Sequence, residues 1–410
     1  MSVSLGDIRA AAERIAGIAH RTPLLYSRSL SDMTGAQVYL KAENLQRAGS
    51  FKIRGAVNRL TTLGRDQLAN GVIAASAGNH AQGVALASRL LGPGLGFPDG
   101  VPCTIVMPRG AAMTKIQATS GYGATVVLHG ETFDDALAEA QRQAQAQGKT
   151  FIHAFDDEAV VAGQGTLGLE LADDLPDADF VLVPIGGGGL ISGVATALAE
   201  LAPRCQVIGV QAEAATAATQ SIRQGKRLAV TARPTIADGI AVGQPGALTL
   251  PIMQRLVRDV VTVSEEETAH AILMLLERTK LLVEGAGAVS VAALLGGKVP
   301  VQGKKVIAVL SGGNIDTTVI ARTLQHGMAH AGRYLVLRVT VPDHPGGLAG
   351  LLNVVARAGG NVLEVAHDRY QRETRLGEVV VELSLEARDA AHSAEVVAAI
   401  HEGGYRLGSQ

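Results

Sequence analysis

The sequence predicts an α/β protein built on mostly parallel sheets, followed by a separate and smaller α+β domain. Its 410 residues exceed the usual length of one domain, so two or more folding units are expected. Up to about residue 325, short unbroken apolar runs alternate with longer helical patterns. Such runs are typical of strands covered by helices on both faces of a parallel sheet. Beyond Gly332 the pattern changes to a short series of strands and two helices.

The apolar runs of the first part are the predicted strands, and they lie at residues 72–75, 103–107, 124–128, 181–184, 207–210 and 306–310. Helices are expected between them, for example over residues 133–145, 190–201 and 265–280. Ser264 and Glu267 form a capping box at the start of the last of these. Because ligands of such sheets bind at the carboxyl ends of strands, the strand-to-helix turns are the candidate sites.

The last part of the chain reads as strand, helix, two strands, helix and strand, at residues 334–341, 347–358, 361–370, 378–385, 391–402 and 405–407. This βαββαβ order is typical of a ferredoxin-like α+β unit, with two helices on one face of an antiparallel sheet. We therefore expect a separate domain at residues 333–410, joined to the first part by residues 321–332.

Composition excludes several classes of partner. With 36 Lys and Arg against 38 Asp and Glu, the net charge is −2, which offers no general attraction for nucleic acid. No apolar stretch reaches the ~18 residues of a membrane span, and two cysteines cannot form a disulfide framework. A cytoplasmic protein is expected, with no nucleic-acid or membrane partner. Glycine is unusually frequent, at 49 residues, which indicates either flexible linkers or backbone that approaches something closely.

Lys52 follows a further predicted strand, at residues 38–41, and stands at the start of a helix. There the helix macrodipole disfavours a cation and would lower the pKa of the amine. A lysine with a lowered pKa can act as a nucleophile toward carbonyl groups and afterwards as a base. An ordinary solvated helix lysine is the alternative interpretation of this residue alone.

The strand at residues 72–75 runs into small and polar residues that begin a helix, namely Ser76, Ala77, Gly78, Asn79 and His80. Backbone N–H groups at such a start can bind a carboxylate. An ordinary capped helix fits the same residues. His80 taken singly is better explained as a packed, hydrogen-bonded histidine than as a catalyst.

Four successive glycines follow the strand at residues 181–184, and they are Gly186, Gly187, Gly188 and Gly189, with Leu190 next. N–H groups exposed at this helix start suit a phosphate. The run lacks the lysine of a P-loop and the spacing of a dinucleotide-binding turn, so a small phosphorylated cofactor is favoured. Ser311 ends the strand at residues 306–310, where its hydroxyl could bind a heteroaromatic nitrogen or cap a helix.

In combination, these features resemble the pyridoxal-phosphate enzymes of fold type II, the tryptophan synthase β-subunit fold. Within them the sequence is similar to the threonine dehydratase (threonine ammonia-lyase) and serine racemase group. The matching runs are residues 50–55, 76–83, 186–190 and 311–314, with 22–24, 235–240 and 283–287 in addition, so that the resemblance covers about residues 5–329. Residues 334–410 resemble an ACT regulatory domain, through residues 343–348 and 359–361.

The resemblance implies a catalytic domain over residues 1–330, made of two three-layer α/β subdomains, the smaller of which (about 41–155) is inserted in the larger. It also implies a site for pyridoxal 5′-phosphate. Lys52, next to Phe51, would bind the cofactor covalently and remove the Cα proton of the substrate. The tetraglycine run and Leu190 would bind the phosphate, Asn79 the ring oxygen and Ser311 the ring nitrogen. Residues 76–80 would bind the substrate carboxylate.

The implied activity is conversion of L-threonine to 2-oxobutanoate and ammonia, with L-serine as a side substrate. A neutral serine at the ring nitrogen makes a weaker electron sink than a carboxylate, which favours elimination. The alternatives are serine racemase and 3-hydroxyaspartate dehydratase, or a non-catalytic amino-acid sensor. Ala77 stands where racemases of the group have a serine, which disfavours racemization. Thr219 stands where their cation site has an Asp, six residues after a Glu near Glu213, so no metal is predicted.

For the C-terminal domain, the resemblance implies an effector site at Asp343, Gly346, Gly347, Leu348 and Asn361. N–H groups at this helix start could bind the carboxylate of an amino acid. An adenine nucleotide is the other candidate, and a plain dimerization module is the alternative. Isoleucine inhibition would suit isoleucine biosynthesis, and nucleotide activation would suit catabolism. A homodimer or homotetramer is expected in either case.

Overall fold

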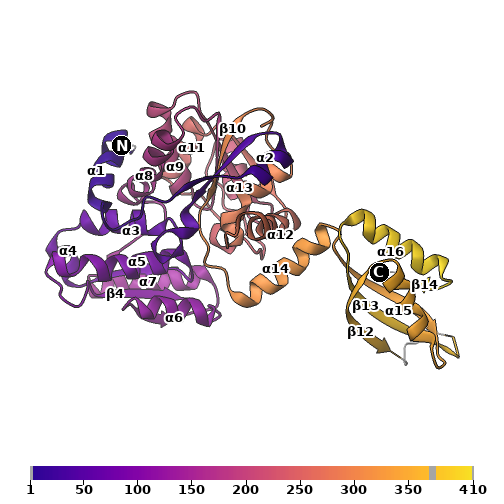
Figure 1. Cartoon of the computed structure of the whole chain (residues 1–410). Coiled ribbons are helices and arrows are strands. Elements are labelled where there is room, and N and C mark those ends of the chain that lie inside the picture. The colour runs from indigo at the N-terminus through magenta and orange to yellow at the C-terminus, as the bar shows by residue number, and fades with distance from the viewer. Residues whose placement is uncertain (1–2, 369–374, 409–410) are drawn as a thin grey trace. The chain divides into compact units, whose positions relative to one another are not determined.

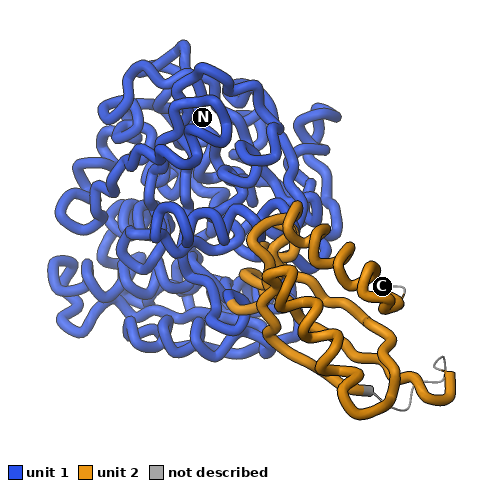
Figure 2. The backbone as a smooth tube through the Cα atoms, turned by 45° about the vertical axis from the view of Figure 1, so that its right-hand side comes forward, with its two compact units in different colours: residues 1–320 blue, residues 321–410 orange. Residues whose placement is uncertain are grey.

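The computed structural model describes residues 3–368 and 375–408. The chain divides into two compact units, Met1–Ile320 and Ala321–Gln410. Figure 1 shows the elements of both units, and Figure 2 shows the course of the backbone in each. The helix α14 (Thr317–His330) spans the division, so the predicted connection at residues 321–332 is largely helical.

The larger sheet of the first unit has the strand order β1-β2-β10-β7-β8-β9. All neighbours are parallel except β1, which is antiparallel to β2. The strands are β1 (Leu24–Tyr26), β2 (Gln37–Ala42), β7 (Phe180–Pro184), β8 (Gln206–Ala212), β9 (Asp259–Val263) and β10 (Lys305–Leu310). Successive residues of β10 enter different cores: Val306 packs with α2, α12 and α13 on one face, and Ile307 packs with α8, α9 and α11 on the other. This sheet is therefore the middle of three layers.

The helices of the first unit are α1 (Leu5–Ile15), α2 (Arg28–Thr34), α3 (Lys52–Thr61), α4 (Arg65–Ala69), α5 (Asn79–Leu91), α6 (Met113–Gly121), α7 (Phe133–Gln147), α8 (Glu158–Asp174), α9 (Gly189–Leu201), α10 (Ala217–Gln224), α11 (Thr249–Leu256), α12 (Glu265–Met274), α13 (Gly285–Leu295) and α14. Short 3-10 turns are η1 (Glu43–Leu45), η2 (Arg47–Gly49), η3 (Pro93–Leu95) and η4 (Asp238–Ile240), and η5 (Leu275–Thr279) is a π-helix.

A second parallel sheet has the order β5-β4-β3-β6. Its strands are β3 (Val72–Ala75), β4 (Cys103–Met107), β5 (Thr125–Leu128) and β6 (Thr150–Phe151). One face packs with α3 and α5, and the other packs with α7. The fold prediction of two three-layer α/β assemblies is thus confirmed, and the predicted insertion at about residues 41–155 contains this sheet.

The second unit forms an antiparallel sheet in the order β12-β13-β11-β14. Its elements are β11 (Tyr334–Pro342), α15 (Gly347–Arg357), β12 (Asn361–Asp368), β13 (Glu378–Glu386), α16 (Ala390–Glu402) and β14 (Arg406–Leu407). One core joins both helices to one face of the sheet. This is the predicted ferredoxin-like order. The end of the strand predicted at residues 361–370 lies outside the described residues.

One predicted helix ends differently. The pattern over residues 265–280 predicts a single helix, and Ser264 caps it with Glu267 as expected. The α-helix stops at Met274, and the chain continues through the π-helix η5 to Lys280, whose φ is +62°. After this irregular turn, Val283 is fully buried and Glu284 is 4% exposed. The turn thus brings a carboxyl group into the interior.

Candidate active site

Lys52 is the first residue of α3, as predicted, and its side chain is part-buried. Its Nζ donates to the carbonyl oxygen of Ala154 at 2.9 Å and lies 5.1 Å from the ring centroid of Phe51. Burial lowers the pKa of Lys52 to about 8, while attraction to Glu284 opposes this change. A lowered pKa was expected from the position at a helix start, and the structure adds burial, which disfavours the charged amine.

Asn79 begins α5, and both ends of its amide are held. Its Oδ1 accepts from Nδ2 of Asn314 at 2.7 Å, and its Nδ2 donates to Oε1 of Glu284 at 2.5 Å. Asn314 also donates to the carbonyl oxygen of Ala48, a residue with φ of +56° just before the lysine loop. An amide has two N–H donors on its nitrogen, so one remains available to a ligand.

The predicted carboxylate nest lies between β3 and α5. Ser76 Oγ accepts from the N–H of Gly78 at 3.1 Å. Within the described part of the chain, no hydrogen bond uses the backbone N–H of Ala77, Asn79 or His80 as donor. These N–H groups, at the start of a helix of 13 residues, are therefore available to an anion.

His80 is a packed, neutral histidine, in line with the interpretation of the residue alone. Burial lowers its pKa to about 3, and the charge of Lys52 contributes. Nε2 lies 3.0 Å from the carbonyl oxygen of Ile152. Because a carbonyl only accepts, Nε2 carries the proton and Nδ1 is left as an acceptor. That Nδ1 atom is buried without a partner in the described residues.

The tetraglycine run joins β7 to α9 and packs tightly against the protein. A Cβ on Gly187 would lie 2.3 Å from the ring of Phe155, and one on Gly188, whose φ is +96°, would lie 2.8 Å from Met253. The carbonyl oxygen of Gly187 accepts from Oγ1 of Thr249 at 2.6 Å. Among residues 3–368 and 375–408, no hydrogen bond uses the N–H groups of residues 186–190 as donors. The run thus presents a row of N–H groups.

Ser311 follows β10 and is 3% exposed. Its carbonyl oxygen accepts from the N–H of Phe51 at 3.2 Å, so the loop after β10 is joined directly to the lysine loop. Its Oγ lies at a long 3.4 Å from the carbonyl oxygen of Ala286. Nearby Ser50 is fully buried, and its Oγ has no partner among the described residues.

Three charged groups act on the pKa of Glu284, and they come from different elements. Burial raises the pKa of Glu284 to about 7, repulsion by Asp238 adds to this, and Lys115 and Lys52 oppose it. Lys115 in α6 pairs with Asp238 in η4, with Nζ 2.7 Å from Oδ2. Burial alone would lower the pKa of Lys115, but Asp238, followed by Glu284 and Asp316, raises it.

A buried ionic network supports the helix of Lys52 from behind. Arg54, 1% exposed, pairs with Glu43 at 2.8 Å and with Glu170 at 2.6 Å. Lys41 pairs with Glu170 at 2.7 Å. Burial alone would raise the pKa of Glu43, but Arg54, Thr22 and Lys41 together outweigh it, so this pKa lies below its usual range. The network joins α3 to β2, η1 and α8.

These residues fit pyridoxal phosphate. An amine with a lowered pKa suits an aldehyde, and the free N–H groups of the tetraglycine run suit a phosphate. The remaining N–H of Asn79 and the hydroxyl of Ser311 offer hydrogen bonds to a ring. The structure thus brings together the predicted residues of strands β3, β7 and β10 with Lys52. Sequence reasoning missed Glu284 and Asn314 as site residues, although both lie in quoted runs, at residues 283–287 and 311–314.

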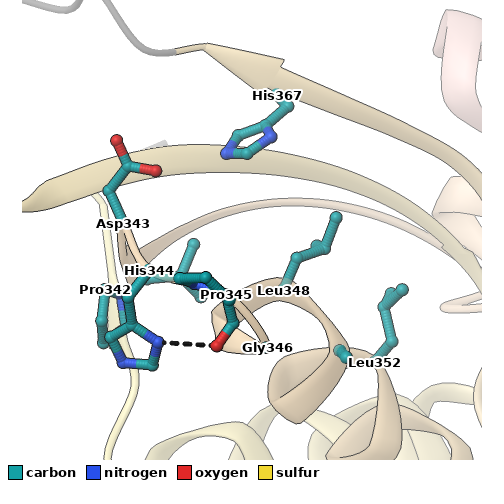
Figure 3. A pocket seen from close by; sticks show the side chains of 10 residues that line it. Pro342, Asp343, His344, Pro345, Gly346, Leu348, Leu352 and His367 are labelled. Carbon is teal, nitrogen blue, oxygen red and sulfur yellow. Dashed lines mark hydrogen bonds between the residues drawn. The ribbon is translucent and has the colours of Figure 1, made fainter.

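A cavity of about 550 Å³ lies in the second unit (Figure 3). Asp343, Gly346 and Leu348 of the predicted effector site line it, together with Val341, Pro342, His344, Pro345, Ala349, Leu352 and His367. Gly347 begins α15 beside it, and a Cβ there would lie 2.3 Å from the carbonyl oxygen of Pro342. Asn361 does not line this cavity; its Nδ2 donates to Glu386 at 3.2 Å, at the opposite end of β12 from His367.

Comparison with known proteins supports this interpretation. A family model described as pyridoxal-phosphate dependent enzyme matches residues 15–312. Over 405 residues the chain is 47% identical to a Thermotoga maritima protein named L-threonine ammonia-lyase, covering 99% of each chain. Maize serine racemase superposes with a TM-score of 0.74 at 34% identity, covering 80% of this chain and 99% of that one. The processed form of threonine deaminase isoform 2 from Solanum lycopersicum superposes with a TM-score of 0.73 at 38% identity, covering 78% and 86%.

No helix in the described ranges is both long enough and apolar enough to span a membrane.

Proposed function

The chain belongs to the family of pyridoxal-phosphate-dependent enzymes, and we propose that it converts L-threonine to 2-oxobutanoate and ammonia. The observation that carries the proposal is the amine of Lys52, whose pKa is lowered to about 8 and which stands among free N–H groups at the starts of α5 and α9. The near full-length similarity to an L-threonine ammonia-lyase supports the choice of substrate.

The cofactor would be held by residues that the structure brings together. Lys52 would bind its aldehyde carbon, the N–H groups of residues 186–190 its phosphate, Asn79 its ring oxygen and Ser311 its ring nitrogen. When bound, pyridoxal phosphate supplies an electron sink that acidifies the Cα proton of an amino acid. Ser311 offers a neutral hydroxyl, beside which the ring nitrogen of a bound cofactor would stay largely unprotonated, and this would favour elimination of the β-substituent.

The protein's own residues perform the remaining tasks. The N–H groups of Ala77, Asn79 and His80 bind the substrate carboxylate and orient Cα. The amine of Lys52, which the lowered pKa keeps partly unprotonated near neutral pH, removes the Cα proton. His80 is neutral, and its Nε2 is held by the carbonyl oxygen of Ile152. It therefore adds no positive charge that would repel the protonated amine of Lys52.

A product assay separates the candidates within the family. L-threonine, L-serine and 3-hydroxyaspartate are supplied in parallel, and ammonia, 2-oxo acids and D-amino acids are measured. The proposal predicts 2-oxobutanoate from threonine as the main product and little D-serine, because Ala77 has no acidic group to reprotonate Cα. D-serine as the main product would favour a racemase, oxaloacetate a 3-hydroxyaspartate dehydratase, and no product at all a sensor.

We further propose that the second unit is an ACT-type regulatory domain with its effector in the cavity of Figure 3. The cavity joins the N-terminus of α15 to the apolar side chains of Leu348 and Leu352. Free N–H groups there suit a carboxylate, and the apolar wall suits a branched side chain. An amino acid such as isoleucine or valine therefore fits better than a nucleotide, which would need a larger polar surface.

Equilibrium binding tests this assignment. Isoleucine, valine and adenine nucleotides are titrated into the full-length protein and into Leu352→Ala, with Val336→Ala as the control because Val336 is 44% exposed and does not line the cavity. Amino-acid binding that weakens only in Leu352→Ala supports the proposal. Saturable nucleotide binding instead, or no binding at all, would reject it and favour a nucleotide site or a dimerization module.

The proposal includes a cytoplasmic homodimer or homotetramer. The edge strand β12 exposes Leu363 and Val365, which favours pairing with another subunit. Light scattering coupled to size-exclusion chromatography gives the mass in solution, and a monomer would contradict this part of the proposal.

A further inference from the structure

Glu284 contacts the proposed machinery, but the reaction as proposed gives it no task. Its Oε1 accepts from Asn79 at 2.5 Å, and the residue is 4% exposed. The backbone of Glu284 is anchored as well, since its N–H donates to the carbonyl oxygen of Gly312 at 3.1 Å. The carboxyl is thus held at a fixed place, against the amide that would bind the ring oxygen of the cofactor.

The contact is sensitive to the charge of Glu284. An ionised carboxylate accepts a shorter and stronger hydrogen bond than a protonated carboxyl. With Asn314 fixing the oxygen of the Asn79 amide, the Glu284 carboxylate fixes one N–H and directs the second toward a ligand. Protonation of Glu284 would weaken one of these two restraints.

The charges that act on Glu284 come from three elements. Lys52 lies in α3 and Lys115 in α6, and both attract its carboxylate. Asp238 in η4 repels it, and Asp316, which precedes α14, acts on Lys115. Nζ of Lys115 lies 2.7 Å from Oδ2 of Asp238, and Oγ1 of Thr114 lies 3.3 Å from Oδ2 of Asp316. The start of α6, from the smaller sheet assembly, thus contacts two acidic residues of the larger one.

We propose that Glu284 is a positioning residue for Asn79 and that the Lys115–Asp238 pair, which joins α6 to η4, sets the charge of Glu284. The inference rests on the proposed function, because Asn79 matters as the partner of the cofactor. The two members of the pair have opposite effects on the charge of Glu284. Lys115 stabilises the carboxylate and Asp238 destabilises it, so removing each charge moves the titration of Glu284 in opposite directions.

The test compares the acid limb of kcat/KM for L-threonine, and the pH midpoint of the visible absorption of the bound cofactor, in the full-length holoenzyme. Lys115→Met is expected to move both to higher pH by about one unit, and Asp238→Asn to move both to lower pH. Lys115→Arg restores the wild-type midpoint. Lys149→Met is the matched control, because Lys149 lies in the same assembly and contacts Thr104 instead.

A double variant closes the test. In Glu284→Gln this limb is expected to disappear, and adding Lys115→Met should then cause no further shift. A purely structural ion pair predicts that Lys115→Met and Asp238→Asn have the same effect. Shifts of equal sign, no shift in either, or a Lys115 shift that persists in Glu284→Gln would overturn the proposal. If Glu284→Gln does not fold, the opposite signs of the two single variants still decide.

The spectral readout separates this inference from the proposed function. Absorption midpoints that move as expected, in a protein that releases no ammonia from threonine, would reject the proposed substrate and keep the role of Glu284. Ammonia release from threonine with unmoved absorption midpoints would keep the proposed substrate and reject the role of Glu284.

Discussion

Nδ2 of Asn314 donates a hydrogen bond to Oδ1 of Asn79 at 2.7 Å, across 235 residues of sequence. This contact decides which way the Asn79 amide faces, because an oxygen must lie opposite the donor. The nitrogen of Asn79 is thereby turned toward Glu284 and toward the space beside Lys52. Asn314 thus orients Asn79, a predicted cofactor residue. The two residues belong to different motifs and come together only in the folded chain.

Asn314→Asp should weaken cofactor binding about 10- to 100-fold. The new carboxylate would face Oδ1 of Asn79 without a donor, and leaving a buried acceptor unpaired costs ~1–3 kcal/mol. Titration of the cofactor-free protein with pyridoxal phosphate measures the affinity. Asn70→Asp is the control, because Asn70 donates to Gly148 at an exposed position. Wild-type affinity in Asn314→Asp would show that Asn314 does not orient Asn79.

Gly187→Ala should also weaken cofactor binding, for a steric reason. The added Cβ would lie 2.3 Å from the Phe155 ring, and overpacking of this kind costs ~1–3 kcal/mol. The ring or the loop must move, which displaces the N–H groups of the run. Gly94→Ala is the control, because a Cβ there meets nothing within 4 Å. Equal affinities for pyridoxal phosphate in the two variants would argue against a shaped phosphate cradle.

Arg54→Met should lower the free energy of unfolding by ~3–5 kcal/mol, because it leaves Glu43 buried without its partner. In the wild type the lowered pKa of Glu43 contributes stability that is present above the ordinary value of 4.5 and is lost as the pH falls through the lowered value. In the variant, burial would raise the pKa of Glu43. Acidification from neutral pH should therefore reduce the difference between wild type and variant in the free energy of unfolding.

Urea unfolding at several pH values measures this difference. Arg142→Met is the control, because Arg142 pairs with Glu139 at the surface and should matter little. A difference that grows on acidification would contradict the assigned role of Arg54.

Lys52 should react with amine reagents at lower pH than an ordinary lysine. Burial places its pKa at about 8, against ~10.4 for an exposed lysine, so most of the amine is unprotonated above pH 8. Competitive acetylation of the cofactor-free protein, read by mass spectrometry, gives the midpoint for this residue. Glu284→Gln should lower that midpoint further, because it removes an attraction that favours the charged amine. A midpoint near 10 would contradict the assignment.

The strands were predictable because their apolar runs are local and are covered on both faces. Each predicted run overlaps an observed strand, and the turns after β3, β7 and β10 carry the predicted site residues. The irregular turn after α12 was not predictable, because the residues of η5 continue a helical pattern and give no local signal for a π-helix. That turn delivers Glu284 to the interior.

The rest of the site depends on contacts between distant segments. Glu284 and Asn79 are 205 residues apart, and Phe155 meets Gly187 only after two sheets have formed. The glycine excess has two explanations that the sequence could not separate, namely backbone that closely approaches a ligand and backbone that closely approaches other parts of the protein. Gly187 is required by the neighbouring Phe155, whereas a Cβ on Gly78 would meet nothing within 4 Å. Close approach of backbone to protein therefore accounts for some glycines that were attributed to a ligand.

The central claim is that this chain uses Lys52 and pyridoxal phosphate to release ammonia from L-threonine. The most direct test is the formation of 2-oxobutanoate from L-threonine by the pyridoxal-phosphate-loaded protein and by its Lys52→Ala variant, at equal concentrations of folded protein. We predict steady production by the wild type and its loss in Lys52→Ala. An equally active Lys52→Ala variant, or a cofactor-loaded wild type that forms no 2-oxobutanoate, would contradict the claim.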